Sequence, residues 1–590
     1  MVKIKINNTP LRVAQGTTIL DAAKELNIKI PTLCYHPDLC IAGSCRICVV
    51  EEKRARTLLA SCCTPVAEGM EILTNTKKVR TARKHIIAMM LSEHAENCVH
   101  CFKNMNCELQ SLSREYSVET QNLINICKPE ELDISSPSIK KDFAKCIRCQ
   151  RCVRTCADLQ HVTALTAAHK GSEMKIATFL EKPLAEVVCT NCGQCVNRCP
   201  TGALTEQSYV EAVWNAINSP DKHVVVQTAP AVRVAIGEEL GYDPGNRLTG
   251  KMVTALKRIG FNTVFDTDFT ADLTIMEEGT ELLTRLKKAL KDKEPAPLPQ
   301  YTSCSPGWIK YIEHEFPDQL EKVSTCKSPQ QMFGALAKTY YAQKAEVDPK
   351  DIVVVSIMPC TAKKFEAGRP EMWSSGFRDV DYVLTTRELA LMIEQTGIDF
   401  RNLEPSHFDS LMGMSTGAGV IFGATGGVME AAIRTVYEIV TGREIPFKNL
   451  EVAPVRGMEG VKEASLKLEG CLPEWDFLEG VELRVAVAHG LVNARKVAKQ
   501  VEAGNSPYHF IEIMACPGGC LGGGGQPIPT NCDIRLARAK AIYEEDESME
   551  LRKSHENPEV TMIYKDFLKE PLGHKSHKLL HTTYTKRKKY

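Results

Sequence analysis

The chain has 590 residues, and its 73 acidic residues balance 73 basic ones, so the formal net charge is zero. A chain of this length is too long for one hydrophobic core, and a balanced charge does not favour nucleic acid or an anionic membrane as a partner. No apolar stretch is long enough to span a bilayer, and the first residues alternate like a strand instead of forming the apolar block of a signal peptide, so we expect a soluble, unexported, cytoplasmic protein of several domains.

The 25 cysteines fall into short-spaced sets that are separated by long tracts without cysteine. Many disulfides are typical of small secreted domains, whereas short spacings of this kind are typical of metal ligation. We therefore expect a reducing compartment and several metal centres.

Residues 1–78 are predicted to form the first domain. Two alternating strands flank a turn at Asn7–Pro10, and a helix follows from Thr18. The cysteines then run Cys34-x10-Cys45-x2-Cys48-x13-Cys62. A close pair on a glycine-containing loop, with one cysteine upstream and one well downstream, favours a plant-type 2Fe-2S cluster. Zinc is the alternative, and it is less favoured because zinc prefers two matched close pairs.

Residues 79–125 are predicted to be mainly helical, with an apolar face between Thr81 and Leu91. The stretch continues into His94-x3-Cys98-x2-Cys101-x5-Cys107. A lone histidine on a helix is usually packed or solvated, but this one lies beside three cysteines that lack a fourth partner. Three thiolates and an imidazole complete a tetrahedral shell, and the spacing alone leaves zinc and iron-sulfur open.

Residues 126–207 contain the one clear internal repeat. Its halves are Cys146-x2-Cys149-x2-Cys152-x3-Cys156 and Cys189-x2-Cys192-x2-Cys195-x3-Cys199. In two-cluster ferredoxins with this spacing, three cysteines of one half hold a 4Fe-4S cluster and the fourth ligates the other cluster. We therefore predict one cluster on Cys146, Cys149, Cys152 and Cys199, and a second on Cys189, Cys192, Cys195 and Cys156. The first half has Ala157 where proline is usual, which leaves the ligand count intact.

From residue 208 onward, apolar strand-like runs alternate with helical stretches. The runs are 223–227, 351–357, 483–488 and 508–514, and a clear helical stretch is 492–503. This alternation predicts a large α/β domain, residues 208–590, built mainly on parallel strands. The run 417–427 lacks the lysine of a phosphate loop and the spacing of a dinucleotide fingerprint, so we interpret it as close backbone packing. The basic run Lys586–Lys589 is expected to be a solvated terminus.

Three apolar runs of this domain end in cysteines. Cys304 follows a short run from Pro299, Cys360 follows residues 351–358, and Cys516 and Cys520 emerge on glycine-rich backbone after residues 508–514. Open α/β sheets bind ligands at the carboxyl ends of their strands, so we expect these thiols to meet at one point. Glycines 518, 519 and 522–525 allow backbone amides to approach a bulky inorganic ligand. A metal cluster is favoured over a glycine-rich turn with incidental buried cysteines.

Three segments of the chain resemble the signature segments of the catalytic domain of FeFe hydrogenases. They are Thr302–Trp308 (TSCSPGW), Met358–Glu366 (MPCTAKKFE) and Glu512–Gly525 (EIMACPGGCLGGGG). The resemblance extends over essentially the whole chain. The first 207 residues are also similar to the large iron-sulfur subunit of respiratory NADH dehydrogenases, where a Cys-x-x-Pro closes the 2Fe-2S loop. Cys62–Pro65 matches that pattern, which favours Cys62 over Cys63 as a ligand.

The resemblance implies a multidomain α+β fold. Its parts are a β-grasp 2Fe-2S domain (1–78), a small helical domain with a His-ligated 4Fe-4S cluster (79–125), a two-cluster ferredoxin domain (126–207) and a large α/β catalytic domain (208–590). The cofactors that it implies are one 2Fe-2S cluster, three accessory 4Fe-4S clusters and an H-cluster. The H-cluster is a 4Fe-4S unit joined through a cysteine sulfur to a di-iron centre with carbon monoxide, cyanide and a dithiolate amine.

The resemblance also assigns roles around the H-cluster. Cys520 is implied as the bridging thiolate, Cys360 and Cys516 as further ligands of the 4Fe-4S part, and Lys363 as the partner of a cyanide ligand. Met358 and Met514 are expected to pack on the di-iron centre, in a pocket shaped by Ala229, Pro230, Gln330 and Phe422. A proton relay is implied from Cys304 through Glu278, Ser324, Glu281 and Arg285. Without the resemblance, a solvated acidic face is an equal interpretation of Glu278 and Glu281.

One position departs from the family pattern. Relatives have the fourth cysteine ligand of the 4Fe-4S unit where this chain has Ser305. A serine hydroxyl is a poor iron ligand unless it is deprotonated, and an alkoxide is harder than a thiolate. Ser305 as an alkoxide ligand, Cys304 taking its place, and an unstable cluster are three open alternatives.

The predicted function is that of an FeFe hydrogenase catalytic subunit, which interconverts protons and electrons with H2. Four accessory clusters make an electron conductor to ferredoxin, to an NAD(P)-binding flavoprotein subunit, or to both, and we expect a hetero-oligomer. A non-catalytic iron-sulfur electron carrier and an H2 sensor on the same fold are the alternatives. The thiols beyond residue 207 argue against the first alternative, and the relay residues argue against the second.

Overall fold

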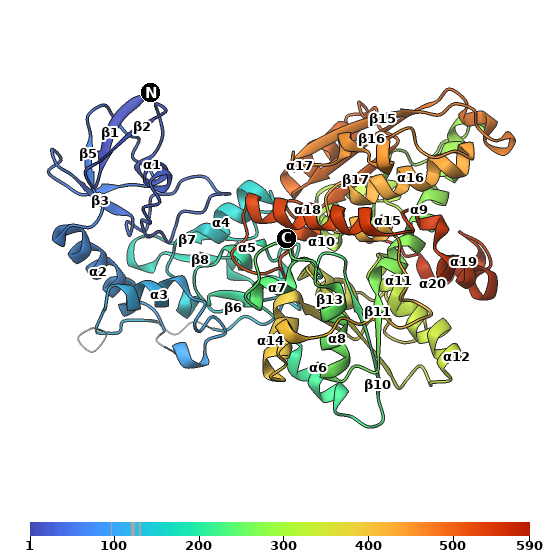
Figure 1. The fold of residues 1–590 in the computed structure, drawn as a ribbon, viewed down its shortest axis with the longest axis horizontal. Coiled ribbons are helices and arrows are strands. Elements are labelled where there is room, and N and C mark those ends of the chain that lie inside the picture. The colour runs from blue at the N-terminus through green and yellow to red at the C-terminus, as the bar shows by residue number, and fades with distance from the viewer. Residues whose placement is uncertain (96, 120–123, 129–130, 590) are drawn as a thin grey trace.

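The computed structural model describes residues 1–95, 97–119, 124–128 and 131–589, so the predicted helical region that ends at 125 is described only in part. Figure 1 shows an amino-terminal β-sheet at one end of the long axis and a larger α/β body at the other, with residues 139–206 between them. The fold is mixed α and β, as predicted. No helix in the described part of the chain is both long and apolar enough to cross a membrane.

The amino-terminal sheet has the strand order β2-β1-β5-β3-β4. A tight turn joins β1 to β2, with Val2 opposite Val13, and both Asn7 and Asn8 have positive φ. Asparagine tolerates that conformation well, which explains why the predicted hairpin forms here. Helix α1 begins after Thr18, whose side chain accepts a hydrogen bond from the backbone of Asp21. The elements are β1 (Val2–Ile6), β2 (Thr9–Val13), α1 (Ile19–Glu25), β3 (Val49–Glu52), β4 (Leu59–Ala60) and β5 (Glu71–Leu73).

The middle of the chain consists of short elements around cysteine loops. Helices α2 (Lys77–Ser92) and α3 (Glu108–Glu115) flank the His94 set. The repeat is visible in the backbone, because α4 (Arg151–Arg154) and α5 (Gln194–Arg198) each start after a left-handed residue, Gln150 and Gly193 respectively. Two small antiparallel pairs complete this part: β6 (Ile139–Lys141) with β9 (Leu204–Glu206), and β7 (Thr166–Ala168) with β8 (Lys175–Ala177).

The large body contains two four-stranded sheets. The first is entirely parallel, and its strands are β11 (Thr263–Asp266), β10 (His223–Thr228), β13 (Ile352–Met358) and β14 (Tyr382–Thr385). The second has the order β12 (Gln300–Tyr301), β17 (Phe510–Met514), β16 (Glu482–His489) and β15 (Val461–Lys467), with β15 antiparallel at the edge. All four predicted strands are present, and the predicted helix 492–503 is α17 (Leu491–Glu502). Buried valine runs such as 224–226 fit strands that are covered on both faces.

Helix α9 (Thr267–Leu290) is unusually long and is buried along most of its length. It packs against α11 (Pro329–Leu336), α15 (Gly417–Ile421) and α16 (Gly427–Thr441). Because neighbours cover it on several sides, the acidic side chains of this helix lie inside the protein. The interpretation of Glu278 and Glu281 as a solvated acidic face is therefore wrong: they are 1% and 8% exposed.

The lysines of the basic run near residue 589 are exposed, as predicted for a solvated terminus, but the run also forms ion pairs with the protein that the sequence did not predict. Lys586 forms an ion pair with Asp318, Arg587 with Glu313, and Lys589 with Glu315. Glu313 and Glu315 lie on α10 (Pro306–Glu315), the helix that begins directly after Ser305. The acidic face of α10 explains why a charged segment docks here. We call residues 582–589 the strap.

One ion-pair junction joins three parts of the chain. Asp38, in the loop after α1, accepts hydrogen bonds from Arg198 of α5 and Arg535 of α18 (Cys532–Ser548), both at 2.9 Å. The Arg198 side chain is fully buried. A buried guanidinium that loses its carboxylate is left as an uncompensated charge.

We predict that Asp38→Asn destabilises this junction by roughly 3–5 kcal/mol, because removing one partner of a buried ion pair strands the other. The matched control is Asp21→Asn, which removes the partly exposed pair with Lys24 and should cost less than about 1 kcal/mol. Thermal unfolding and the rate of protease cleavage measure the effect. Equal effects of the two substitutions would contradict the prediction.

Candidate metal centres and active site

The predicted thiols of the large body meet at one cavity. Cys304 follows β12, Cys360 follows β13, and Cys516 and Cys520 follow β17, so the carboxyl ends of three strands supply sulfur from both sheets. The lining also contains every other predicted pocket residue: Ala229, Pro230, Ser305, Gln330, Met358, Lys363, Phe422 and Met514. The prediction that these residues come together is confirmed.

The chemistry of this cavity fits an iron cluster. Burial raises the pKa of the Cys520 thiol to about 12 and raises the pKa values of Cys304, Cys360 and Cys516 as well. Metal binding stabilises thiolates, and soft sulfur ligands suit iron. Four sulfurs around an otherwise mainly apolar space therefore form a donor set that fits a positively charged metal group.

The glycine-rich loop after Cys520 packs too closely for side chains. A Cβ on Gly523 would lie 2.0 Å from the Pro359 carbonyl oxygen, and one on Gly524 would lie 2.2 Å from that of Cys192. These contacts bring the loop against both the Cys360 segment and the ferredoxin part. The run 417–427 is likewise close-packed, since a Cβ on Gly419 would lie 2.6 Å from the Asp268 carbonyl oxygen. This contact agrees with the predicted backbone packing.

Lys363 brings a cation to the cavity wall. Its ammonium donates to the Cys304 carbonyl at 3.1 Å and to Glu366 at 2.9 Å. Glu366 also accepts from Gln330 at 3.1 Å, which fixes two cavity residues on one carboxylate. The Gln330 Oε1 atom is buried without a hydrogen-bond partner among the described residues. Gln330, with its unpaired oxygen, and Lys363, with its ammonium group, thus both line the cavity.

Glu278 and Glu281 lie three residues apart on α9, and the charge of Glu278 acts on the Cys304 thiol. Glu281 accepts hydrogen bonds from Ser324 at 2.7 Å and from Arg285 at 2.6 Å. The Glu278 carboxyl oxygens have no hydrogen-bond partner in the described part of the chain. Burial, followed by the charge of Glu281, raises the pKa of Glu278 to about 8. Its environment thus favours the protonated form of Glu278, and the neighbouring Glu281 pairs with Arg285.

Ser305 faces the cavity immediately before α10. Its hydroxyl oxygen accepts a hydrogen bond from the backbone N–H of Ala515 at 3.1 Å. Ala515 precedes Cys516, so Ser305 ties the start of one cysteine segment to another. The hydroxyl retains a lone pair and its own hydrogen for a group in the cavity.

Two further cavities contain the eight cysteines of the repeat. Cys146, Cys149, Cys152 and Cys199 line one of about 310 Å³, and Cys156, Cys189, Cys192 and Cys195 line another of about 420 Å³. This grouping has the crossed pattern that the spacing predicts. Cys192 also lines the large cavity, so the second set lies directly beside it.

The amino-terminal cysteines gather on loops beside their sheet. The Cys62 thiol interacts with the thiols of both Cys34 and Cys48, and Cys34 interacts with that of Cys45. Cys62 is buried, whereas the Cys63 side chain is exposed. The geometry therefore favours Cys62, as the sequence pattern does.

The His94 set lies against the first cavity of the repeat. His94 is buried, and its Nδ1 atom has no hydrogen-bond partner among the described residues. Burial lowers the pKa of His94, which keeps the imidazole neutral and able to bind a metal. Cys107 contacts the Pro200 carbonyl at 3.7 Å, and a Cβ on Gly202 would lie 2.6 Å from the Cys101 sulfur. Cys98 is the exposed member of the set.

Residues that the sequence interpretation missed support the glycine-rich loop. Gln194 donates to the Gly522 carbonyl at 2.7 Å, Asn197 to that of Gly523 at 2.9 Å, and Arg387 to that of Gly524 at 2.9 Å. His489, at the end of β16, accepts from the Gly518 N–H at 3.1 Å, and burial lowers its pKa to about 4. Single side chains of this kind belong to no sequence motif. Of these four residues, only Gln194 and Asn197 could have been suspected, because they lie inside the second cysteine run.

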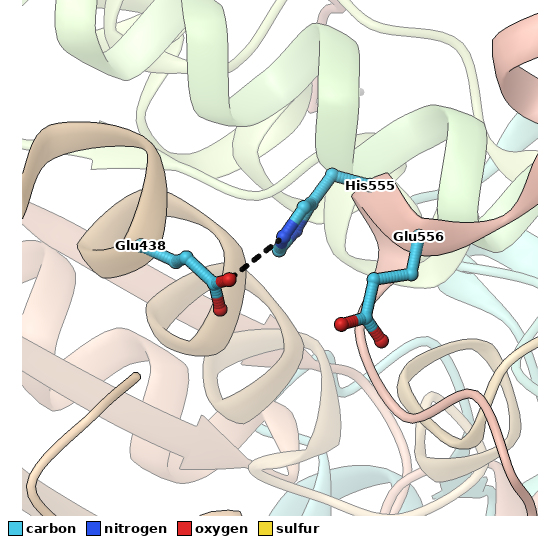
Figure 2. Close-up of side chains that lie close together, drawn as sticks. All are labelled: Glu438, His555 and Glu556. Carbon is cyan, nitrogen blue, oxygen red and sulfur yellow. Dashed lines mark ion pairs between the residues drawn. The ribbon is translucent and has the colours of Figure 1, made fainter. Parts of the chain in front are cut away.

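Figure 2 shows a separate cluster of Glu438, His555 and Glu556, whose potential ligand atoms lie within 4.8 Å of one another. Lys553 forms ion pairs with Glu438 at 2.8 Å and with Glu556 at 3.0 Å. The carboxylates therefore already share a cationic partner. The arrangement is a partly buried ion-pair network.

Family models match five parts of the chain. The iron only hydrogenase large subunit, C-terminal domain, matches residues 222–524, and the iron hydrogenase small subunit matches residues 532–587. The 2Fe-2S iron-sulfur cluster binding domain matches residues 1–77. The NADH-ubiquinone oxidoreductase-G iron-sulfur binding region matches residues 83–122, and the ferredoxin-like domain of NADH-quinone oxidoreductase subunit 3 matches residues 136–205.

Three relatives agree with these matches. The NADP-reducing hydrogenase subunit HndD of Solidesulfovibrio fructosivorans is 49% identical, with all of both chains covered. Iron hydrogenase 1 of Clostridium pasteurianum is 40% identical over 99% of this chain and 100% of its own length. The solved structure of the FeFe hydrogenase HydA1 from Chlamydomonas reinhardtii has a TM-score of 0.58 and 45% identity, and covers 64% of this chain and 99% of its own. The chain therefore belongs to the iron-only, or FeFe, hydrogenases, as a catalytic subunit that acts on H2 and carries accessory iron-sulfur domains.

Proposed function

We propose that the chain interconverts H2 with protons and electrons in the cavity between the two sheets. The observation that carries the proposal is the meeting of Cys304, Cys360, Cys516 and Cys520 there. Cys360, Cys516 and Cys520 would hold the H-cluster, with Cys520 as the bridging thiolate. The bound cluster supplies the redox chemistry of hydrogen. The remaining roles belong to side chains of this chain.

The proton path begins at Cys304 and runs along α9. Cys304 exchanges a proton with the reacting centre, and Glu278 is the acid or base next to it. Ser324 donates to Glu281, and Arg285 binds Glu281 at the outer end. A donor whose pKa lies near the working pH passes protons in both directions, which supports this role for Glu278.

The rest of the cavity provides charge and excludes water. Lys363 would compensate a negative ligand of the di-iron centre, because its ammonium is held at the wall by Glu366. Met358, Met514, Ala229, Pro230 and Phe422 would fill the space around that centre, and Gln330 would offer it a polar contact. A mainly apolar surround strengthens each electrostatic contact.

Electrons would enter through one 2Fe-2S and three 4Fe-4S clusters. We assign these to the four cysteine sets and to domains at 1–78, 79–125 and 126–207, with the catalytic domain at 208–590. Contacts between the sets support the path: Arg154 donates to the Cys34 carbonyl and to the Cys149 carbonyl. Cys192 then borders the catalytic cavity.

The electron partner would be an NAD(P)-binding flavoprotein subunit, ferredoxin, or both, in a cytoplasmic hetero-oligomer. Two observations support a partner subunit: HndD is described as the subunit of an NADP-reducing hydrogenase, and two matched regions are of NADH dehydrogenase type. A chain that served only as an electron carrier would not need the thiol-lined cavity. An H2 sensor would keep the cavity but show no turnover.

Matured protein should evolve H2 from a reduced viologen dye, and Glu278→Gln should lower that rate by roughly 100-fold or more, since the relay loses its titrating group. Asp272→Asn is the matched control, because Asp272 is a buried acid on the same helix that bonds to Thr416 and Asn557 instead. Gas chromatography measures H2. Iron-bound carbonyl bands in the infrared without any H2 would refute turnover and favour a sensor.

The raised pKa of Glu278 predicts a pH-dependent stability. In the window between its ordinary value of 4.5 and about 8, the folded protein keeps a proton that the unfolded chain has lost. Wild-type stability should therefore fall relative to Glu278→Gln as pH rises through that window, by up to about 5 kcal/mol. Thermal unfolding of both proteins at pH 5 and pH 8 tests this. A difference in melting temperature that does not change with pH would contradict it.

Ser305→Cys should raise turnover or iron occupancy of the cavity and leave the accessory cluster spectra unchanged. A thiolate supplies the soft fourth ligand that a hydroxyl does not. Ser303→Cys is the matched control, because Ser303 donates to the Cys326 carbonyl and does not line the cavity. Iron analysis and electron paramagnetic resonance measure the effect. No change in either property would mean that Ser305 already ligates well or that Cys304 takes its place.

A further inference from the structure

A hydrogen-bonded branch leaves the proton path at Glu281. The Thr325 hydroxyl lies 3.3 Å from Glu281 Oε1 and 2.8 Å from His581 Nδ1. On its other side, His581 Nε2 lies 3.1 Å from Glu277 Oε2. The branch therefore joins two carboxylates of α9 through a threonine and a histidine that come from outside the helix.

The branch is closed to solvent at its inner end. Glu277 is fully buried and His581 is 5% exposed. Glu277 also accepts hydrogen bonds from the Tyr564 hydroxyl at 2.6 Å and from the Leu572 N–H at 2.8 Å. Among the described residues, its ion-pair partner is His581 alone.

Other titratable groups surround the pair. The exposed His577 of α20 (His574–Leu580) stacks on the His581 ring, with 4.7 Å between ring centroids. Arg285 pairs with Glu281, and the Cys326 sulfur lies 3.9 Å from Glu281 Oε2.

The Thr325 hydroxyl has one hydrogen, so it can donate to His581 or to Glu281 but not to both. When His581 is neutral, its Nε2–H donates to Glu277, and its Nδ1 accepts the Thr325 hydrogen. When His581 is an imidazolium, its Nδ1–H donates to the Thr325 oxygen, and the Thr325 hydrogen turns to Glu281. The Glu281 carboxylate thus has one more donor when His581 is charged.

We propose that His581 is a positioning residue that sets the proton affinity of Glu281 through the direction of the Thr325 hydroxyl. The proposal rests on the proton path of the proposed function. A proton on Glu281 Oε1 passes to the Thr325 oxygen as the Thr325 hydrogen passes to His581 Nδ1. The products are a Glu281 carboxylate and an imidazolium that faces Glu277, so no oxidant or further reactant is needed.

Two substitutions prevent the Thr325 side chain from donating to Glu281. Thr325→Val removes the hydroxyl with little change of shape. In His581→Gln, the amide nitrogen donates to Glu277 and the amide oxygen accepts from Thr325, which copies neutral histidine. In the holoenzyme of both variants, the Glu281 carboxyl infrared band should titrate about 1 pH unit higher than in the wild type, because a hydrogen bond to a charged group contributes about that much.

The band is assigned by its loss in Glu281→Gln. Thr280→Val is the matched control, since Thr280 lies on α9 and donates to the Met276 carbonyl instead. Thr325→Ser keeps a hydroxyl and should restore the wild-type midpoint, and the double variant should shift no further than either single one. The proposal would be overturned if the Glu281 band titrated at the same midpoint in Thr325→Val, His581→Gln and Thr280→Val. Normal turnover in Glu278→Gln would instead refute the relay, and the infrared shift would still report on the branch.

Discussion

The close contact between the glycine-rich loop and the second cysteine run is the constraint on which the remaining structure depends. Gln194 and Asn197 bind the carbonyls of Gly522 and Gly523, and Gly524 allows no Cβ against Cys192. Electron transfer needs such proximity, and the loop can approach only because it lacks side chains. The sheets, the strand ends and the ion pairs at Asp38 hold this contact in place.

In the proposed function, protons reach the same cavity along α9. Helix α9 supplies Glu277, Glu278 and Glu281 from one buried face, and the segments that follow residue 322 supply the hydroxyls between them. A buried carboxyl group without hydrogen-bond donors is costly to ionise. Glu278 is such a group, whereas Glu281 pairs with Arg285. In the proposed function, electrons would enter from the side of α5 and protons from the side of α9.

The grouping of the thiols could be predicted from the sequence because ligand sets have fixed spacings. The crossed grouping of the repeat, the strands that end at Cys360 and Cys516, and the preference for Cys62 could all be derived from short patterns. His489, Arg387 and Thr325 could not, since each acts through contacts with residues far away in the chain. The ion pairs of the run Lys586–Lys589 were not predicted because its acidic partners on α10 are adjacent only in the folded protein.

The strap has a consequence for the order in which the site is built. Tyr584 donates to the Ser324 carbonyl, and the Thr582 N–H donates to that of Thr325, so the strap fixes the two hydroxyl residues of the proton path. During synthesis these residues leave the ribosome after the cavity walls have been made. The nascent chain can thus form its cysteine segments before the strap fixes Ser324 and Thr325.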